Sequence, residues 1–451
     1  MNKREFLAMG GAVPLMLAGC GGSSTGSAPM RLVNASVGYP TALGFTDEST
    51  QITTGVAYGA ASAFFNVEAG QVHLALTTTI GGTETSATAA QLRTLAKDQR
   101  YSLVAYGLLN ELRFVPVAEL TTTPDAGTAS VNVLNTSADI GAVDVYLSTA
   151  KDLSVATLLV SGIVASTTSP SQSAFATDIK PGTYYVTVVG NNNLTDVRFQ
   201  TPTPITLAAL QILTIILTPG AGGSLANAIM LTQGTSGSAT PVQNTSARVR
   251  AITSTNGLSA QVTGTDNTGT AITLLASNTT PQYSNYFVTS TGTPPTVVVN
   301  GATVTPFMIV AGVQQAATLA AGGDYTLMVY VSGSTPVAQL IADDNTAPTI
   351  AQGSKFRLIN LAANNQGLEL SMSINSLNVA SQVAYGTAST YTELATPQAT
   401  ASVAEVSNGT DTLTTHTQVM QLGNIFTDIV TSVDPSTGVA KDIFRAANSP
   451  T

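Results

Sequence analysis

The sequence predicts an all-β fold class: tandem Ig-like antiparallel β-sandwich domains, arranged as beads on a string. Three observations predict it: an internal repeat, apolar residues that alternate with polar ones, and the absence of long helical stripes. The chain has 451 residues, enough for about three or four domains. Hydrophobic residues make up 43% and charged residues only 9%, which excludes disorder driven by charge.

The repeat is carried by short evenly spaced segments. Thr94-Leu95-Ala96 recurs as Thr206-Leu207-Ala208 and again as Thr318-Leu319-Ala320, and Val56-Ala57-Tyr58-Gly59 recurs as Val383-Ala384-Tyr385-Gly386. Each unit is large enough to have its own core, which favours separate domains over a solenoid. The predicted β-sandwich repeats cover residues 30–123, 128–235, 245–345 and, in diverged form, 353–451.

Strands are predicted almost throughout. Val143 to Leu147 and Glu369 to Asn375 alternate apolar and polar residues, which indicates one buried and one exposed face. Two windows, 89–96 and 420–429, favour short helices instead.

Glycine turns open several of the predicted strands. Gly182 precedes Tyr184, and Gly323 precedes Tyr325, while Gly70 occupies the corresponding place in the first repeat. A tyrosine two residues after such a turn resembles the tyrosine corner of Ig-like sandwiches, whose hydroxyl bonds to nearby backbone. These residues are therefore predicted to have structural roles.

Several of these segments together resemble a known bacterial family. Arg31 to Ser36, Gly55 to Gly59 and Lys180 to Tyr184 are similar to the family catalogued as domain of unknown function 4397. The resemblance implies secreted or surface β-sandwich repeats, often in lipoproteins, and no established activity. It is weaker in the third repeat and returns at 357–388.

The first nineteen residues have the form of an export signal. Lys3 and Arg4 precede an apolar stretch that is too short to span a membrane. The stretch ends in Leu17-Ala18-Gly19-Cys20, which resembles the bacterial lipobox. That resemblance implies cleavage before Cys20 and lipidation of this residue, followed by a Gly/Ser tether over 20–29. Gly21 rather than aspartate follows Cys20, which resembles the outer-membrane address of Gram-negative lipoproteins and implies that location.

Few residues suit catalysis or metal binding. The single cysteine excludes disulfides and cysteine-built zinc sites, and no phosphate-binding loop is present. His73 lies in an alternating strand and His416 in a threonine-rich segment, and both are interpreted as surface residues. Asp343, Asp344 and Asn345 form an oxygen-rich linker that is a candidate for calcium. No cofactor is expected, and the net charge of -9 argues against nucleic-acid partners.

The sequence therefore predicts a non-enzymatic, lipid-anchored protein of the cell envelope that acts as a spacer, adhesion or binding module. Its membrane partner would be reached through lipidated Cys20. One alternative is a periplasm-facing accessory lipoprotein that binds a glycan or a protein. Another is a hydrolase that uses carboxylates.

Overall fold

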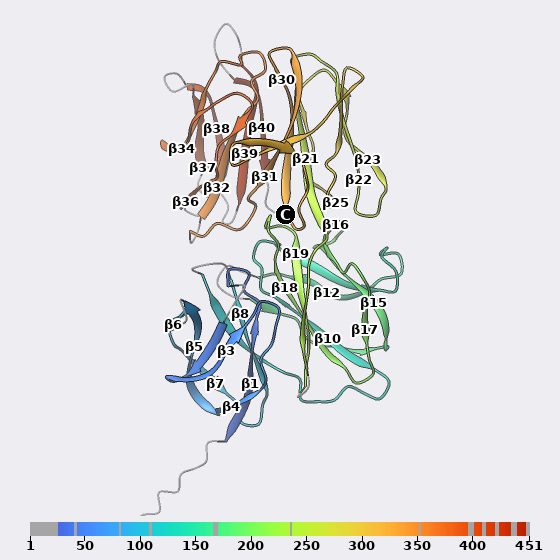
Figure 1. Cartoon of the computed structure of the whole chain (residues 1–451), viewed down its shortest axis with the longest axis vertical. Helices are drawn as coiled ribbons and strands as arrows, with labels where there is room; N and C mark the ends of the chain where they lie inside the picture. Colours follow the sequence, from blue (N-terminus) through green and yellow to red (C-terminus); the bar gives the residue numbers. More distant parts are fainter. Residues whose placement is uncertain are drawn as a thin grey trace, which may run out of the picture.

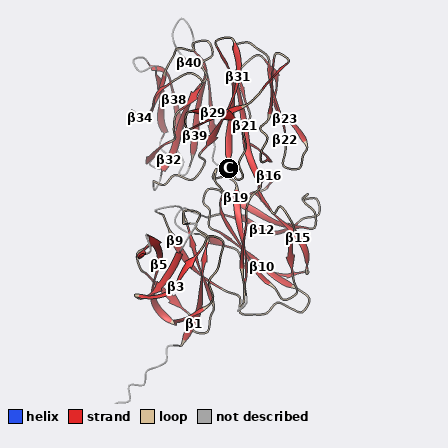
Figure 2. Cartoon of the chain, viewed as in Figure 1, coloured by secondary structure: helices blue, strands red, loops and turns tan. Residues whose placement is uncertain are grey.

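Strands are the regular elements of the computed structural model, which describes residues 26–39, 43–80, 83–107, 111–165, 170–234, 237–350, 353–395, 401–407, 412–419, 424–433 and 440–447. Figure 2 shows strands throughout this described part of the chain and no helix. Eight sheets pair into four sandwiches, which we call units 1 to 4 in chain order. The predicted fold class of tandem β-sandwiches is confirmed.

Units 1 and 2 each enclose a core of their own. Unit 1 has one sheet of β4 (Phe65–Glu68), β1 (Ser27–Asn34), β8 (Tyr101–Tyr106) and β9 (Arg113–Ala118), and a second of β3 (Thr50–Val56), β2 (Leu43–Asp47), β5 (Gly70–Ile80), β6 (Thr83–Ser86) and β7 (Gln91–Leu95). Unit 2 has one sheet of β13 (Ser171–Gln172), β14 (Ala176–Ile179), β10 (Ala129–Asn135), β18 (Ile212–Pro219), β19 (Ala226–Thr232) and β20 (Ala239–Val242), and a second of β12 (Thr157–Ile163), β11 (Val143–Ser148), β15 (Gly182–Gly190), β16 (Asn193–Gln200) and β17 (Ile205–Leu207).

Units 3 and 4 repeat the arrangement around two further cores. Unit 3 has one sheet of β24 (Gln282–Tyr283), β25 (Phe287–Ser290), β21 (Ser246–Ser254), β30 (Asp324–Ser332), β31 (Thr335–Asp343), β28 (Phe307–Val310) and β29 (Val313–Ala316), and a second of β23 (Ala271–Asn278), β22 (Ala260–Thr265), β26 (Thr296–Val299) and β27 (Ala302–Val304). Unit 4 has one sheet of β35 (Thr387–Ala388), β36 (Thr392–Ala395), β32 (Gly353–Asn360), β39 (Ile425–Val433) and β40 (Ala440–Ala447), and a second of β34 (Leu377–Val383), β33 (Leu370–Ile374), β37 (Ala401–Ser407) and β38 (Thr412–Val419).

One parallel strand pair recurs in every unit. The first strand of each unit runs parallel to a strand near its end: β1 with β8, β10 with β18, β21 with β30 and β32 with β39. The connection between these two strands contains the whole second sheet, which is long enough for the crossover that parallel strands require. Among the described strands, the other pairings are antiparallel except for a single parallel pair between β28 and β31 in unit 3.

The repeated Thr-Leu-Ala segments close the cores in the same way. Leu95 pairs with Gly70, Leu207 with Gly182, and Leu319 bridges to Gly292. All three leucines are buried.

The turn that follows each Thr-Leu-Ala segment is also repeated. In units 1 and 3 the amides of Ala96 and Ala320 donate to the hydroxyls of Tyr101 and Tyr325, at 3.0 and 2.9 Å. Unit 2 has Leu213 at this position, and Gln211 Oε1 accepts the amide of Ala208 at 2.8 Å instead. Tyr184 lies on β15 in the other sheet, where its hydroxyl donates to Lys180 O at 2.9 Å. The turn at Gly182 and Tyr184 and the turn at Gly323 and Tyr325 therefore occupy different positions in their sandwiches.

Replacing Tyr325 with phenylalanine should cost unit 3 about 1 kcal/mol of unfolding free energy, because the Ala320 amide loses its acceptor. Chemical denaturation of the purified chain measures this loss. Tyr146→Phe removes a hydroxyl from β11, away from such a turn, and is the control. An equal loss in both variants would contradict the role of the turn.

Where the structure describes them, the two windows predicted as helices form strands, so those predictions were wrong. Residues 91–95 form β7, and 425–433 form β39 in the centre of the mixed sheet of unit 4. Ile425, Phe426, Ile429 and Val430 are all buried, because Phe426 and Val430 pack in the core of unit 4 and Ile429 packs in the apolar cluster between units 3 and 4. Packing between sheets therefore overrides the helical spacing of their apolar residues.

Two unit boundaries also differ from the predicted ones. β1 begins at Ser27, so 27–29 belong to the fold rather than to the tether over 20–29, because Ala28 is fully buried in the core. Unit 2 extends beyond residue 235, because β20 adds residues 239–242 to the edge of its mixed sheet.

The units pack in pairs, so they are more than a string joined by linkers. Figure 1 shows units 1 and 2 side by side in one half of the molecule, lobe A, and units 3 and 4 in the other, lobe B. Val33, Leu134 and Ile216 belong to a shared apolar cluster in lobe A. Ile252, Met328 and Ile359 belong to the corresponding cluster in lobe B. In each lobe the outer faces of the two mixed sheets meet.

A glycine-rich loop joins the two lobes. The amide of Gly222 donates to Gly322 O at 2.7 Å, and the amide of Asn345 donates to Gly222 O at 3.0 Å. A Cβ atom on Gly223 would lie 2.2 Å from Asn345 O, so only glycine allows this approach. Residues 220–223 therefore form a joint between the lobes.

Candidate functional site

A buried arginine marks the first strand of unit 1. Arg31 on β1 bonds Glu119 Oε1 at 2.6 Å and Ser102 Oγ at 3.0 Å within its own unit. Its other donors reach the carbonyls of Thr232 and Gly237 in unit 2, both at 3.1 Å. Arg31 therefore crosses the interface of lobe A.

In lobe B, an arginine on the first strand of each unit contacts the other unit. In the strand register of unit 3, Arg250 on β21 lies opposite Thr326 on β30, just as Arg31 on β1 lies opposite Ser102 on β8. Of the two arginines on β21, Arg250 rather than Arg248 is therefore the counterpart of Arg31. Arg250 donates to Thr427 Oγ1 of unit 4 at 3.2 Å. In the opposite direction, Arg357 of unit 4 donates to Asp343 Oδ1 of unit 3 at 2.5 Å.

The candidate calcium ligands of the linker are engaged by these cations. Asp343 is buried at the end of β31 and is bonded by Arg357, Thr326 and Tyr286. Burial would raise the pKa of Asp343, but the guanidinium groups of Arg357 and Arg250 hold that pKa below its usual value. Asn345 donates to Asp324, and Asp344 bonds Lys355 Nζ at 3.0 Å. Because guanidinium groups repel a cation, this set of residues does not suit calcium.

The repeated tyrosines also link units. Tyr58 Oη lies 2.8 Å from Thr218 Oγ1 across the interface of lobe A. Tyr385 Oη donates to Val331 O at 2.7 Å across the interface of lobe B. The tyrosines of the Val-Ala-Tyr-Gly repeat therefore form contacts between units rather than a ligand site.

The imidazole of His73 pairs with a carboxylate on the surface. His73 lies on β5, and its Nδ1 atom is 3.1 Å from Glu48 Oε1, with both side chains at least half exposed. His416 lies on β38, whose side chains are outside the described part of the structure.

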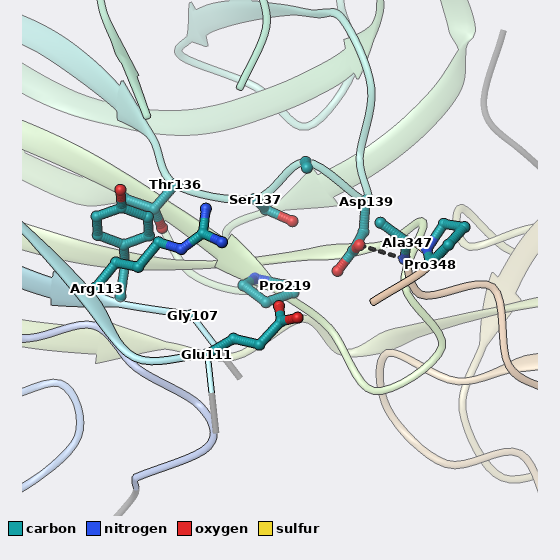
Figure 3. A pocket seen from close by; sticks show the side chains of 11 residues that line it. Gly107, Glu111, Arg113, Thr136, Ser137, Asp139, Pro219, Ala347 and Pro348 are labelled. Carbon is teal, nitrogen blue, oxygen red and sulfur yellow. Dashed lines mark hydrogen bonds between the residues drawn. The ribbon is translucent and has the colours of Figure 1, made fainter. Parts of the chain in front are cut away.

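A cavity of about 50 Å³ lies where units 1 and 2 meet the segment that connects units 3 and 4 (Figure 3). We call it the junction cavity. Unit 1 contributes Glu111 and Arg113, unit 2 contributes Ser137 and Asp139, and the connecting segment contributes Ala347. Tyr106, Gly107, Thr136, Ala138, Pro219 and Pro348 complete its lining. Sequence reasoning missed it, because three distant segments form it.

Asp139 is the most perturbed carboxylate of the junction cavity. It is 9% exposed, and its Oδ1 atom accepts the amide of Ala347. Burial raises the pKa of Asp139 to about 6, against the opposing effects of the Ala347 amide and of Lys355. Asp344 and Glu111 add repulsion that raises it further. At neutral pH this group is therefore a buried, largely ionised carboxylate.

Asp139→Asn should stabilise the protein at high pH. Because the folded-state pKa lies above the usual value of 3.8, stability from this site is present below about pH 4 and is lost as the pH rises to about 6. Asparagine keeps the acceptor for Ala347 without the charge. We expect a gain of about 2–3 kcal/mol at pH 8 and little change at pH 4. Denaturation in EDTA at both pH values tests this, and equal gains at both would contradict it.

An apolar hairpin is exposed on lobe B. It consists of β28 and β29, and the exposed fractions are 54% for Ile309, 43% for Val310 and 60% for Val313. β29 is the edge strand of its sheet, and all of its residues are exposed. Exposed apolar groups of this kind often mark interaction surfaces.

The predicted lipidation site lies outside the described residues. Leu17, Ala18, Gly19 and Cys20 all precede Gly26, the first residue that the structure describes. Within the described residues, no helix is long and apolar enough to cross a membrane. No group of three or more His, Cys, Asp or Glu residues suited to a metal occurs in that same part of the chain.

Comparisons with known proteins point to one family. No curated protein matches the sequence. One similar solved structure is the crystal structure of the C-terminal fragment of pilus adhesin SpaC from Lactobacillus rhamnosus GG, at 12% identity and a TM-score of 0.10, covering 72% of this chain and 98% of that one. That score supports no structural or functional argument. Residues 28–146 match the family described as domain of unknown function (DUF4397), so unit 1 and the first two strands of unit 2 carry the predicted resemblance.

Proposed function

We propose that this protein is a lipid-anchored, non-enzymatic component of the cell envelope that holds lobe B away from the membrane as a spacer, adhesion or binding module. The observation that carries the proposal is the position of β1. Together with β4, it reaches the end of the molecule opposite lobe B (Figure 1). An anchor just before β1 would therefore place lobe B farthest from the membrane.

The distance from the proposed anchor to the fold is short. Cys20 precedes Ser27, the first residue of β1, by only a few positions. A fully extended chain spans at most about 3.5 Å per residue, so unit 1 would stay within about 25 Å of the bilayer surface. Several acyl chains on Cys20 would make such an anchor stable.

A spacer must also resist bending, and we expect the interfaces between units and between lobes to limit such bending. Units within a lobe share buried apolar clusters. Arg31 donates hydrogen bonds across the interface of lobe A, and Arg357 makes an ion pair across that of lobe B. The lobes are joined through backbone hydrogen bonds of the glycine-rich loop. Interfaces of this kind favour one relative orientation of neighbouring domains.

A binding role is supported by the exposed hairpin of β28 and β29. It lies on the lobe that the anchor would hold outermost. A surface glycan or protein would meet this lobe first. The outer membrane of a Gram-negative cell is the proposed location, from the residue that follows Cys20.

Protease shaving of intact cells tests the proposal. We expect lobe B to be removed by protease while a periplasmic control protein survives. A Cys20→Ser variant should lose its membrane attachment and leave the cell surface. Full protection of the wild-type chain would instead support the periplasm-facing alternative, and hydrolysis that is lost on mutating a carboxylate would overturn the non-enzymatic assignment.

A further inference from the structure

We propose that the junction cavity binds a hard divalent cation, and that calcium bound there fastens units 1 and 2 to the segment that connects units 3 and 4. This site is separate from the candidate linker residues Asp343, Asp344 and Asn345. Calcium binding here would be additional to the proposed role as a spacer, adhesion or binding module, and it does not depend on lipidation of Cys20.

Three oxygen donors of the cavity face the same space (Figure 3). Ser137 is only 1% exposed, and its Oγ atom has no hydrogen-bond partner. Asp139 uses one carboxylate oxygen for Ala347, and none of the described residues is hydrogen-bonded to the other. The side chain of Glu111 approaches from unit 1. A buried hydroxyl without a partner is uncommon, so its presence points to a missing ligand.

Three carboxylates, of Asp139, Glu111 and Asp344, stand against two cationic groups, of Lys355 and Arg113, in and around the cavity. Glu111 and Asp344 both repel the ionised form of Asp139. The positive group that acts on Asp139 is Lys355, which already pairs with Asp344 at 3.0 Å and Glu393 at 3.8 Å. Arg113 lies on the opposite side of the cavity (Figure 3). A bound cation would turn this repulsion between carboxylates into shared coordination.

Calcium suits these donors better than magnesium. Calcium accepts six to eight oxygens in irregular geometry, whereas magnesium requires a near-ideal octahedron and keeps most of its waters. The protein supplies two carboxylates and a hydroxyl, and the cavity leaves room for water as well as the ion. So few protein ligands correspond to the weak class of extracellular sites, with Kd near 10⁻⁴–10⁻³ M.

The test compares thermal unfolding of the purified full chain in EDTA, in 10 mM CaCl₂ and in 10 mM MgCl₂. We expect calcium to raise the unfolding temperature of lobe A by about 3–5 °C and magnesium to raise it less. Asp139→Asn and Glu111→Gln should abolish the calcium shift. Asp125→Asn, which changes an exposed carboxylate between units 1 and 2, should keep it.

A second readout observes binding directly. Terbium, a luminescent substitute for calcium, should show saturable emission excited through Tyr106 in the cavity wall. Ser137→Ala should weaken terbium binding about tenfold without preventing folding. The proposal is overturned if calcium does not shift the wild-type protein, or if Asp139→Asn responds to calcium as the wild type does. Neither result would bear on the anchor at Cys20.

Discussion

Asp343→Ala is expected to open lobe B at a cost of about 3–5 kcal/mol in unfolding free energy. Asp343 accepts bonds from Arg357 across the interface, and Arg250 lies 3.9 Å away. Without this carboxylate, two buried guanidinium groups lose their counter-charge. Chemical denaturation should show the transition of lobe B moving to lower denaturant, while the transition of lobe A stays in place.

The control for this experiment is Asp125→Ala, which removes an exposed carboxylate. It should change the unfolding free energy by less than about 0.5 kcal/mol. If Asp343→Ala behaves like Asp125→Ala, the ion pairs do not hold the two units together.

Gly223→Ala should separate the lobes. Gly223 has φ +100°, and an added Cβ would meet the backbone of Asn345 and Thr346 at 2.2 to 2.4 Å. Backbone strain and steric overlap together should cost about 2–4 kcal/mol at the joint. The open fraction would rise about 30- to 1,000-fold, and limited proteolysis between Thr346 and Ile350 should accelerate accordingly.

Gly269→Ala is the control that separates backbone strain from steric overlap. Gly269 has a similar φ of +89° but nothing within 4 Å of an added Cβ. It should carry the backbone strain alone, inside unit 3, and leave cleavage of the connecting segment unchanged. Small-angle scattering should show a larger radius of gyration for Gly223→Ala only. Equal cleavage in both variants would mean that the glycine-rich loop is not the joint.

The repeating architecture could be predicted because its signals are local. The Thr-Leu-Ala segments recur because each one places a buried leucine opposite a glycine and then turns back on the first strand. Alternation revealed the strands because one face of each sheet packs on a core. The window at 425–429 misled because its apolar residues fit a helix as well as a strand buried on both faces.

The pairing of units could not be predicted in the same way. Arg31 and Arg250 stand at polar positions of alternating strands, where exposure to water is the ordinary expectation. Their partners, Glu119 and Asp343, are remote in sequence and lie next to predicted linkers. The junction cavity depends in addition on the joint between lobes, so it emerges only once all four units are placed.

The mass of the N-terminal peptide tests most directly whether the protein is anchored to a membrane through Cys20. The protein would be extracted from host membranes with detergent and digested, and the peptide that contains Cys20 analysed by mass spectrometry. We expect the mature chain to begin at Cys20 and to carry acyl chains on this residue. An unmodified Cys20 inside a longer chain, in protein recovered from the membrane fraction, would contradict it.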